Sequence, residues 1–296
     1  MKQFCKSSLE CSIVTLEYSF QIFNTTLPIT CYTIPMNEVN KTLFIPLYGK
    51  SKVSKQKIIL DDPMAEKIWA EEGFELSGKS KSKWLAYNMA MRARVFDDWT
   101  DSMLEVDGDS LVLHIGCGLD SRCKRVKRPY KVWVDCDFPD VIEARKQYYS
   151  ESENYKMQVL DASDASQIKN LPDSKTAIIV LEGISMYLTH EQLYNFFEAL
   201  KAKYSKLHIL MDVYTEFGVR ASKFKNPVND VGVTNLYGID DIAAILEGLN
   251  ITCKAEHSFT PSELVEQLKP ADKRFFKLLF TGSFYRKIYR LFELES

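Results

Sequence analysis

The chain has 296 residues, of which 46% are hydrophobic and 26% charged, and its formal net charge is −2. This composition excludes a disordered chain, and the length supplies enough core for one large or two small domains. A near-neutral charge gives no long-range field that would hold a polyanion, so we expect no nucleic-acid partner. We also expect no membrane partner, because no apolar stretch is long enough to cross a bilayer. Seven cysteines without CxxC spacing predict reduced thiols in a cytoplasmic protein and no metal site.

The beginning of the chain differs in composition from the rest. Three of the seven cysteines lie in residues 1–35. The mildly apolar run over residues 12–23 is broken by Glu17 and lacks the small-residue cleavage pattern of a signal peptide. We therefore expect residues 1–35 to be a poorly structured extension or a start-codon overcall, with the folded unit beginning near Met36.

From Met36 onward the chain alternates between helical and strand patterns. Apolar residues at helical spacing over 61–69 and 82–99 predict an α-helical cap, residues 36–108, ahead of a core, residues 109–296. Predicted strands at 110–115, 131–135, 156–160, 176–181 and 207–213 alternate with helices, the clearest at 139–149 and 190–204. Repeated strand–helix units imply a mostly parallel sheet with helices on both faces and a ligand crevice at the carboxyl ends of the strands.

The last part of the chain adds a predicted helix at 239–249, a strand at 251–257 and a basic aromatic run over 274–292. That run suits either an amphipathic element on a membrane surface or a closing helix followed by an antiparallel edge strand. We favour the closing helix and edge strand, because the apolar residues of the run are needed to cover the sheet.

An apolar, β-rich run leads into a glycine turn at Gly116 and Gly118. Glycine has no Cβ, so such a turn can be sharp and can let the backbone approach a ligand, although a bare strand-to-helix turn would use the same residues. Asp135 and Asp137 follow about 20 residues later, where a carboxylate can reach a ribose hydroxyl. Ser121 stands where a dinucleotide fingerprint needs its third glycine. S-adenosylmethionine, with ribose and adenine but no phosphate, therefore fits better than NAD.

Three further places concentrate polar groups at strand ends. Asp161 can accept a hydrogen bond from an adenine amino group, and Glu182 faces the middle of the crevice. Arg92 and Arg94 can hold the carboxylate of a methionine moiety by a bidentate, charge-assisted pair. Each has a structural alternative: Asp161 as a helix cap, Glu182 as a solvated loop residue, and the arginines as ion pairs along their own helix. We favour the binding roles because these positions fall on one edge of one sheet.

Four segments in this order and spacing resemble the leucine carboxyl methyltransferase family: MRARVFDD at 91–98, HIGCGLDSR at 114–122, VDCDFPDVI at 134–142 and EGISMYLT at 182–189. The similarity extends from about Met36 to the C-terminus and is closer to the bacterial O-methyltransferases associated with polyketide-type products. The resemblance implies a class I, Rossmann-like methyltransferase fold, dependent on S-adenosylmethionine, with a helical N-terminal cap.

Matched residue by residue, the resemblance also implies cofactor roles. Arg92 corresponds to the carboxylate-binding arginine and Asp137 to the ribose-binding carboxylate. His114 departs from the pattern, since many methyltransferases carry an acidic residue there, and we assign it no catalytic role. The full set of implied cofactor-binding residues is Lys50, Arg92 with Arg94 as the alternative register, Gly116, Gly118, Asp137, Asp161, Ala162 and Glu182.

The expected reaction is methyl transfer to an oxygen, most simply a carboxylate, of a small-molecule acceptor. The sulfonium is already a strong electrophile, so the protein has mainly to align the oxygen and exclude water. A carboxylate needs no general base, whereas a hydroxyl does. Tyr187 is the candidate for orienting the acceptor. The alternatives are a protein C-terminal carboxylate as acceptor, a non-catalytic regulatory protein that binds S-adenosylmethionine, and a dehydrogenase. The sequence does not indicate an oligomeric state.

Overall fold

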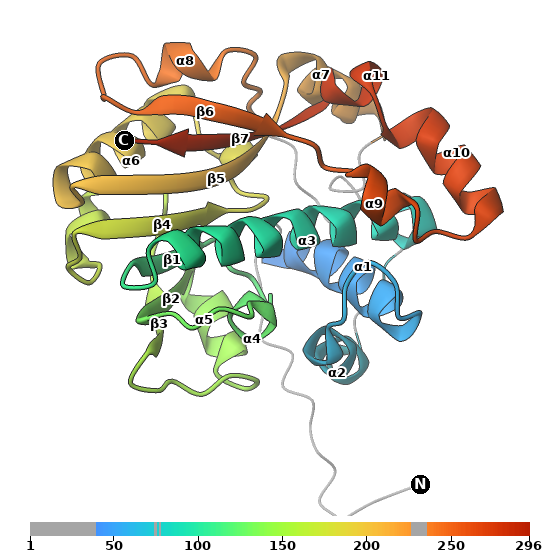
Figure 1. The fold of residues 1–296 in the computed structure, drawn as a ribbon, viewed down its shortest axis with the longest axis horizontal. Helices are drawn as coiled ribbons and strands as arrows, with labels where there is room; N and C mark the ends of the chain where they lie inside the picture. Colours follow the sequence, from blue (N-terminus) through green and yellow to red (C-terminus); the bar gives the residue numbers. More distant parts are fainter. Residues whose placement is uncertain (1–39, 74–75, 77, 226–235) are drawn as a thin grey trace, which may run out of the picture. The chain divides into compact units, whose positions relative to one another are not determined.

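The computed structural model describes residues 40–73, 76, 78–225 and 236–296, and Figure 1 shows their arrangement. The expectations for residues 1–35, and for a folded unit beginning near Met36, concern residues outside this description.

Within the described residues, seven strands form one sheet in the order β3-β2-β1-β4-β5-β7-β6. Strands β1 to β5 pair in parallel, and β7 pairs antiparallel with both β5 and β6. The mostly parallel sheet predicted from the sequence is confirmed. The strands are β1 Leu111–Ile115, β2 Val132–Asp137, β3 Tyr155–Val159, β4 Thr176–Leu181, β5 Lys206–Tyr214, β6 Thr252–His257 and β7 Tyr289–Glu295.

The central strands are buried along their whole length because both faces of the sheet are covered. Every residue of β1 and β4 is buried, as expected for parallel strands inside an α/β fold. On one face Phe196, Phe197 and Leu200 of α6 join the hydrophobic cluster that contains Ile179 of β4. On the other face Phe96 of α3 lies in a second cluster. Figure 1 shows α3 lying across the sheet.

The helices before the sheet are α1 Phe44–Lys55, α2 Pro63–Glu72 and α3 Lys83–Val106; those after β1 are α4 Arg122–Arg125, α5 Pro139–Arg145, α6 His190–Lys203, α7 Glu216–Lys225, α8 Ile242–Ile245, α9 Ser262–Val265, α10 Pro270–Phe280 and α11 Ser283–Arg286. Short 3-10 turns are η1 Asn40–Leu43, η2 Gly78–Lys81, η3 Ala165–Asn170 and η4 Ser185–Tyr187. Two predicted helices are shorter than expected: α5 ends at Arg145, and only α8 forms within 239–249.

Local chemistry explains where several of these helices begin. The side chain of Asp62 caps α2 through the amide of Ala65, and Pro63 occupies the first helical position, where a missing N–H costs nothing. Thr189 and Gln192 form a capping box at the start of α6, as their spacing predicts. Helix α1 was not predicted from the sequence. Eight of its twelve residues are buried, so it has no polar face to produce a helical pattern.

The C-terminal run forms the predicted closing helix and antiparallel strand, but in different places. Helix α10 does not cover the sheet. It packs against the start of α3, where the rings of Trp84 and Phe275 lie 4.5 Å apart and Asp272 accepts a hydrogen bond of 3.0 Å from Tyr87. Strand β7 is not at the edge either, because it inserts between β5 and β6 and leaves β6 as the edge strand. The insertion places Tyr289, the first residue of β7, beside Tyr214, the last residue of β5.

Candidate functional site

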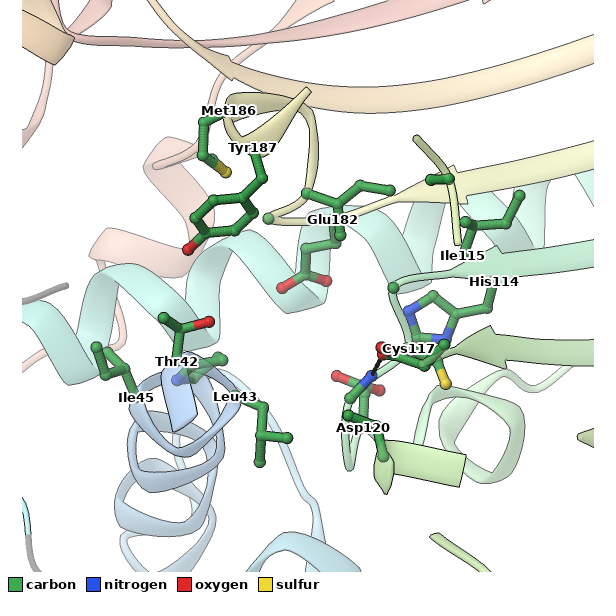
Figure 2. Close-up of a pocket in the computed structure, with 18 of the residues that line it drawn as sticks. Thr42, Leu43, Ile45, His114, Ile115, Cys117, Asp120, Glu182, Met186 and Tyr187 are labelled. Atoms are coloured by element: carbon green, nitrogen blue, oxygen red, sulfur yellow. Dashed lines mark hydrogen bonds between the residues drawn. The ribbon is translucent and has the colours of Figure 1, made fainter. Parts of the chain in front are cut away.

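A cavity of about 440 Å³ opens at the carboxyl ends of the parallel strands. Its wall combines the loops after β1, β2, β3 and β4 with residues of α1, α3 and the start of β7. Figure 2 shows Glu182 projecting into the middle of this space, with His114 and Asp120 on one side and Tyr187 on the other. Nine of the ten residues predicted from the sequence lie on the wall: Lys50, Arg92, Gly116, Gly118, Asp137, Asp161, Ala162, Glu182 and Tyr187.

The tenth residue, Arg94, does not line the cavity. The alternative in which Arg94, and not Arg92, is the carboxylate-binding arginine is therefore wrong. Its Nε donates to Asp98 at 2.8 Å and its Nη1 donates to the carbonyl oxygen of Ile59 at 3.2 Å. The reason is helical geometry, because two residues along a helix turn a side chain by roughly 200°, away from the face that Arg92 occupies. For Arg94 the structure therefore shows the ion pair along its own helix.

The glycine turn after β1 has a structural cause that the sequence did not reveal. Gly116 has φ of 70°, and a Cβ at this position would lie 2.0 Å from Cγ2 of Ile184 in the loop after β4. Gly118 also has a positive φ, of 51°, and its amide donates to Oδ2 of Asp137 at 2.7 Å. Glycine at 116 thus lets two neighbouring loops of the protein meet, as well as forming the turn.

Of the two aspartates in β2, only one faces the cavity. Asp135 is fully buried and accepts hydrogen bonds from Trp133 Nε1 at 2.8 Å and Tyr155 at 2.7 Å, as well as from Arg145. Asp137 lies at the cavity wall, and burial raises the pKa of its carboxyl group to about 6. Asp135 therefore stabilises the core, and Asp137 is the carboxylate available to a ligand.

Arg92 and Glu182 form the centre of a buried ionic network. Nε of Arg92 donates to Glu182 at 3.0 Å, and Nη1 donates to Asp212 at 2.9 Å and to the hydroxyl of Tyr289 at 2.7 Å. Arg122 donates to the other oxygen of Glu182. The predicted bidentate pair between Arg92 and a ligand carboxylate therefore cannot use Nε and Nη1, because both nitrogens already donate to protein groups. Nη2, which lies next to Gly183 in the loop after β4, is the remaining donor.

Burial alone would raise the pKa of Glu182, but the guanidinium groups of Arg92 and Arg122 outweigh it and lower the pKa to about 2. Glu182 is therefore ionised and already paired on both oxygens. It holds Arg92 at the cavity wall and pairs with Arg122, which is fully buried. The alternative of a solvated loop residue is wrong, since the side chain of Glu182 is 6% exposed.

Lys50 lies beneath the glycine turn and pairs with a residue that the sequence analysis left out. Its Nζ donates to Asp120, and both side chains are buried. Asp120 lies on the cavity wall, and Arg125 lies 3.0 Å from its other carboxylate oxygen. Although burial opposes it, the positive charges of Arg125 and Lys50 hold the pKa of Asp120 well below its usual value. The sequence did contain a signal for this residue, since Asp120 lies two positions after Gly118 of the glycine turn.

His114 is structural in this arrangement. Its Nε2 lies 3.1 Å from Nη1 of Arg122, and since a guanidinium only donates, Nε2 must accept. The ring proton therefore resides on Nδ1, which lies 3.3 Å from Asp135. Burial lowers the pKa of His114, so the imidazole is neutral. Arg122, also missed in the sequence analysis, connects His114 to Glu182 and Asp97.

Asp161 and Ala162 line the cavity beyond β3. Oδ1 of Asp161 accepts hydrogen bonds from the amide and the hydroxyl of Ser163, at 2.8 and 2.7 Å. The cap of the following turn η3 is Asp164, whose side chain accepts from Ser166. The alternative role of Asp161 as a helix cap is therefore wrong.

The other end of the cavity is apolar and aromatic. Figure 2 shows Met186 and Tyr187 here, across the cavity from His114 and Asp120. Leu85, Met89 and Tyr214 are further apolar and aromatic residues of the cavity wall. Burial raises the pKa of Tyr187 to about 12, and a hydrogen bond with Thr42 acts in the opposite direction. Figure 2 shows the hydroxyl of Tyr187 directed towards Thr42. Tyr187 is thus a neutral phenol at the border between the polar and apolar ends.

The described residues suit S-adenosylmethionine. The cavity wall offers a half-buried carboxylate at Asp137, the residues Asp161 and Ala162 beyond β3, and the guanidinium group of Arg92. With the sheet order β3-β2-β1-β4-β5-β7-β6, this site defines a class I methyltransferase that depends on S-adenosylmethionine.

The profile of the leucine carboxyl methyltransferase family matches residues 49–201, just over half of the chain. This protein belongs to that family, which confirms the resemblance and the predicted cofactor. It is an enzyme of the methyltransferase class.

Individual relatives agree with this assignment. The tetracenomycin polyketide synthesis O-methyltransferase TcmP of Streptomyces glaucescens is 26% identical over 246 residues, which cover 81% of this chain and 90% of TcmP. The S-adenosyl-L-methionine-dependent methyltransferase dpfgK of Gibberella zeae is 27% identical over 54% of this chain and 59% of its own length. A crystal structure of a Thermobifida fusca protein assigned to the methyltransferases has the same fold, with a TM-score of 0.52 and 15% identity over 79% of this chain and 86% of its own.

Within the described ranges there is neither a candidate metal centre nor a membrane-spanning helix. No group of three or more histidine, cysteine, aspartate or glutamate side chains there is arranged to hold a metal ion. None of the helices that the structure describes combines the length and the apolar character needed to span a membrane.

Proposed function

We propose that this protein transfers the methyl group of S-adenosylmethionine to a carboxylate oxygen of a small-molecule acceptor. The relative TcmP is named as an O-methyltransferase of polyketide synthesis, which supports oxygen as the receiving atom. A cavity of about 440 Å³ is in the range of small-molecule sites. The observation that carries the proposal is the division of this cavity into a charged end at the strand tips and an apolar end without a base.

At the charged end, the proposed cofactor contacts follow from the groups that face the cavity. Asp137 accepts hydrogen bonds from the ribose hydroxyls, and Asp161 with the main chain of Ala162 holds the adenine. Nη2 of Arg92 donates to the carboxylate of the methionine moiety, and Lys50 adds positive charge at the same end. When bound, S-adenosylmethionine supplies a methyl group on a sulfonium that is already strongly electrophilic.

The nature of the acceptor oxygen follows from the groups that are near it. Among the described residues that line the apolar end, the ionisable side chains are tyrosines, and burial raises the pKa of Tyr187 to about 12. His114 is neutral, and Nε2, its lone-pair nitrogen, accepts from Arg122. Neither residue can take a proton from an alcohol at neutral pH. An acceptor that arrives ionised, such as a carboxylate, needs no such base.

Tyr187 has a positioning role in this proposal. Its hydroxyl remains protonated and can donate a hydrogen bond to the acceptor carboxylate at the border of the two ends. The enzyme then contributes mainly by holding the oxygen in line with the methyl group and excluding water through the apolar wall.

The test combines binding with turnover. We expect isothermal titration to show binding of S-adenosylmethionine, and a panel of matched carboxylic acids and alcohols on the same apolar scaffolds to release S-adenosylhomocysteine with the acids only. At saturating S-adenosylmethionine, turnover of an acid should be independent of pH above the pKa of the acceptor, because no protein base has to be deprotonated.

Three outcomes would contradict the proposal. Transfer to the alcohols with a pH-dependent rate would require a base. Transfer only to the C-terminal carboxylate of a protein would identify a macromolecular acceptor, and binding of the cofactor without turnover on any acceptor would identify a regulatory protein.

A further inference from the structure

Three buried polar groups meet in a closed arrangement at the carboxyl edge of the sheet. Nη1 of Arg92 lies 2.9 Å from Oδ2 of Asp212 and 2.7 Å from the hydroxyl of Tyr289, and that hydroxyl donates to the same Oδ2. The three residues are 6%, 0% and 4% exposed, respectively. Each group is therefore satisfied by the other two in surroundings where an unpaired polar group is costly.

The antiparallel direction of β7 makes this meeting possible. Asp212 lies near the end of β5, at the edge where the parallel strands finish. A strand that runs in the opposite direction begins at that edge, and Tyr289 is the first residue of β7. Its register pairs Tyr289 with Tyr214, two positions from Asp212 and on the same side of the sheet.

Asp212 also holds the loop that carries Glu182. Its second oxygen, Oδ1, accepts a hydrogen bond of 2.6 Å from the amide of Gly183, which has φ of 76°. Glu182, the preceding residue, accepts from Nε of Arg92 at 3.0 Å. One carboxylate thus fixes both the arginine and the loop that pairs with it.

Together these bonds determine which part of Arg92 is left for a ligand. A guanidinium has five N–H groups in a rigid plane. Nε is used by Glu182, and both protons of Nη1 are used by Asp212 and Tyr289. The plane is held from two sides, and Arg92 lies on the cavity wall. Nη2 is the nitrogen that Glu182, Asp212 and Tyr289 do not engage.

We propose that Asp212 and Tyr289 are positioning residues that orient Arg92 so that its Nη2 receives the carboxylate of S-adenosylmethionine. The inference rests on the proposed contact of Arg92 with that carboxylate. Removing the Tyr289 hydroxyl should weaken binding of ligands that have the amino-acid moiety and leave binding of the nucleoside part unchanged.

The test uses two ligands that differ in that moiety, S-adenosylhomocysteine and 5′-methylthioadenosine. In Tyr289→Phe the ring remains stacked between Tyr214, 4.6 Å away, and Phe259, 4.4 Å away, and only the hydroxyl is lost. We expect titration to show about tenfold weaker binding of S-adenosylhomocysteine, the order expected for one hydrogen bond to a charged group. Binding of 5′-methylthioadenosine should not change.

Tyr285→Phe is the matched control. Tyr285 is a half-buried tyrosine of this aromatic cluster, but its hydroxyl donates to Asn88 at 2.8 Å rather than to Arg92 or Asp212. We expect this variant to bind both ligands like the original protein. Asp212→Asn, which retains an acceptor for Gly183, should show the same selectivity as Tyr289→Phe and a larger loss.

Equal weakening of both ligands in Tyr289→Phe would mean a general structural role and would overturn the proposal. Arg92→Lys separates the remaining outcomes. If it selectively loses S-adenosylhomocysteine while Tyr289→Phe binds normally, the Arg92 contact stands and the positioning role fails. If it loses neither ligand, both the Arg92 contact and the positioning role fail, although methyl transfer itself can still be measured.

Discussion

At the scale of single residues, Asp137 shows how its surroundings set the chemistry of a binding group. Its carboxylate accepts main-chain hydrogen bonds from Gly118 at 2.7 Å and Phe138 at 2.8 Å. These bonds favour the ionised form, but burial outweighs them and raises the pKa to about 6. The free protein therefore changes the charge of its proposed ribose contact just below neutral pH.

We expect nucleoside binding to weaken as the pH falls. Below about pH 6 Asp137 is protonated in the free protein, and a protonated carboxyl group is a poorer acceptor for ribose hydroxyls. Titration of 5′-methylthioadenosine between pH 7 and pH 5 should show falling affinity. Asp137→Ala should cost about 1–3 kcal/mol of binding at pH 7, and Asp137→Asn should remove the pH dependence. Unchanged affinity in Asp137→Ala would refute the ribose assignment.

Gly116 gives a second prediction at the residue scale. Gly116→Ala places a Cβ 2.0 Å from Ile184 in addition to a strained φ of 70°. Gly73→Ala has a similar φ of 62° and nothing within 4 Å, so it measures the strain alone, about 1–2 kcal/mol. Urea unfolding should show a much larger loss for Gly116→Ala. Ile184→Ala should recover part of that loss, and additivity of the two changes would show that the contact is unimportant.

At the scale of elements, the sequence predicted a helix or strand correctly where the residue pattern within that one element was enough to define it. The strands β1 to β6 lie within two residues of their predicted positions at either end, since alternating or continuous apolar runs reflect burial directly. Helix α1 was not predicted because most of its residues are buried, so it has no alternation of polar and apolar faces. Helix α10 was recognised, but the element that it covers is α3, and no pattern within the helix specifies its partner.

The capping box of α6 gives a prediction for one element. Thr189 accepts from the amide of Gln192 at 3.1 Å, and Gln192 accepts from the amide of Thr189 at 2.9 Å. We expect Thr189→Ala to lower the free energy of unfolding by about 1 kcal/mol, because an amide at the helix start loses its partner. Thr189→Ser keeps the hydroxyl and should cost much less. Equal losses in the two variants, measured by urea unfolding, would point to the methyl group of threonine instead.

At the scale of the whole molecule, buried ion pairs join the N-terminal helices to the sheet. Arg122 connects Asp97 of α3 to Glu182 after β4, and Arg92 continues the chain of charges to Asp212 in β5. Removal of one member leaves its partners charged in a low-dielectric interior, which costs more than an exposed ion pair contributes. Stability of the molecule should therefore depend on the ionisation of Glu182.

The sign of that dependence follows from the pKa. In the folded protein the pKa of Glu182 is lowered to about 2 from an ordinary 4.5, so its contribution is complete above about pH 4.5 and is lost as the pH falls towards 2. We expect the difference in unfolding free energy between the original protein and Glu182→Gln to shrink over this range in urea titrations.

Glu266 provides the control for this prediction. Hydrogen bonds from Lys273 and Lys277 also lower its pKa to about 2, but it is fully exposed. Solvent screens exposed pairs, so Glu266→Gln should have little effect at any pH. An equal pH dependence in the two variants would contradict the importance of burial.

The sequence by itself determined the strand–helix alternation, the glycine turn, the cofactor and nine residues of the cavity wall out of ten that were predicted, because each depends on periodicity, on turn chemistry or on a motif within a short segment. The family resemblance already favoured Asp137 over Asp135 and Arg92 over Arg94, and the tertiary structure gave the reason, because Asp135 and Arg94 are paired elsewhere. Only the tertiary structure added Asp120, Arg122, Asp212 and Tyr289. The contacts of Arg92 with Asp212 and Tyr289 span 120 and 197 residues of sequence. They exist because β7 runs antiparallel beside β5, and no local pattern of residues specifies that pairing.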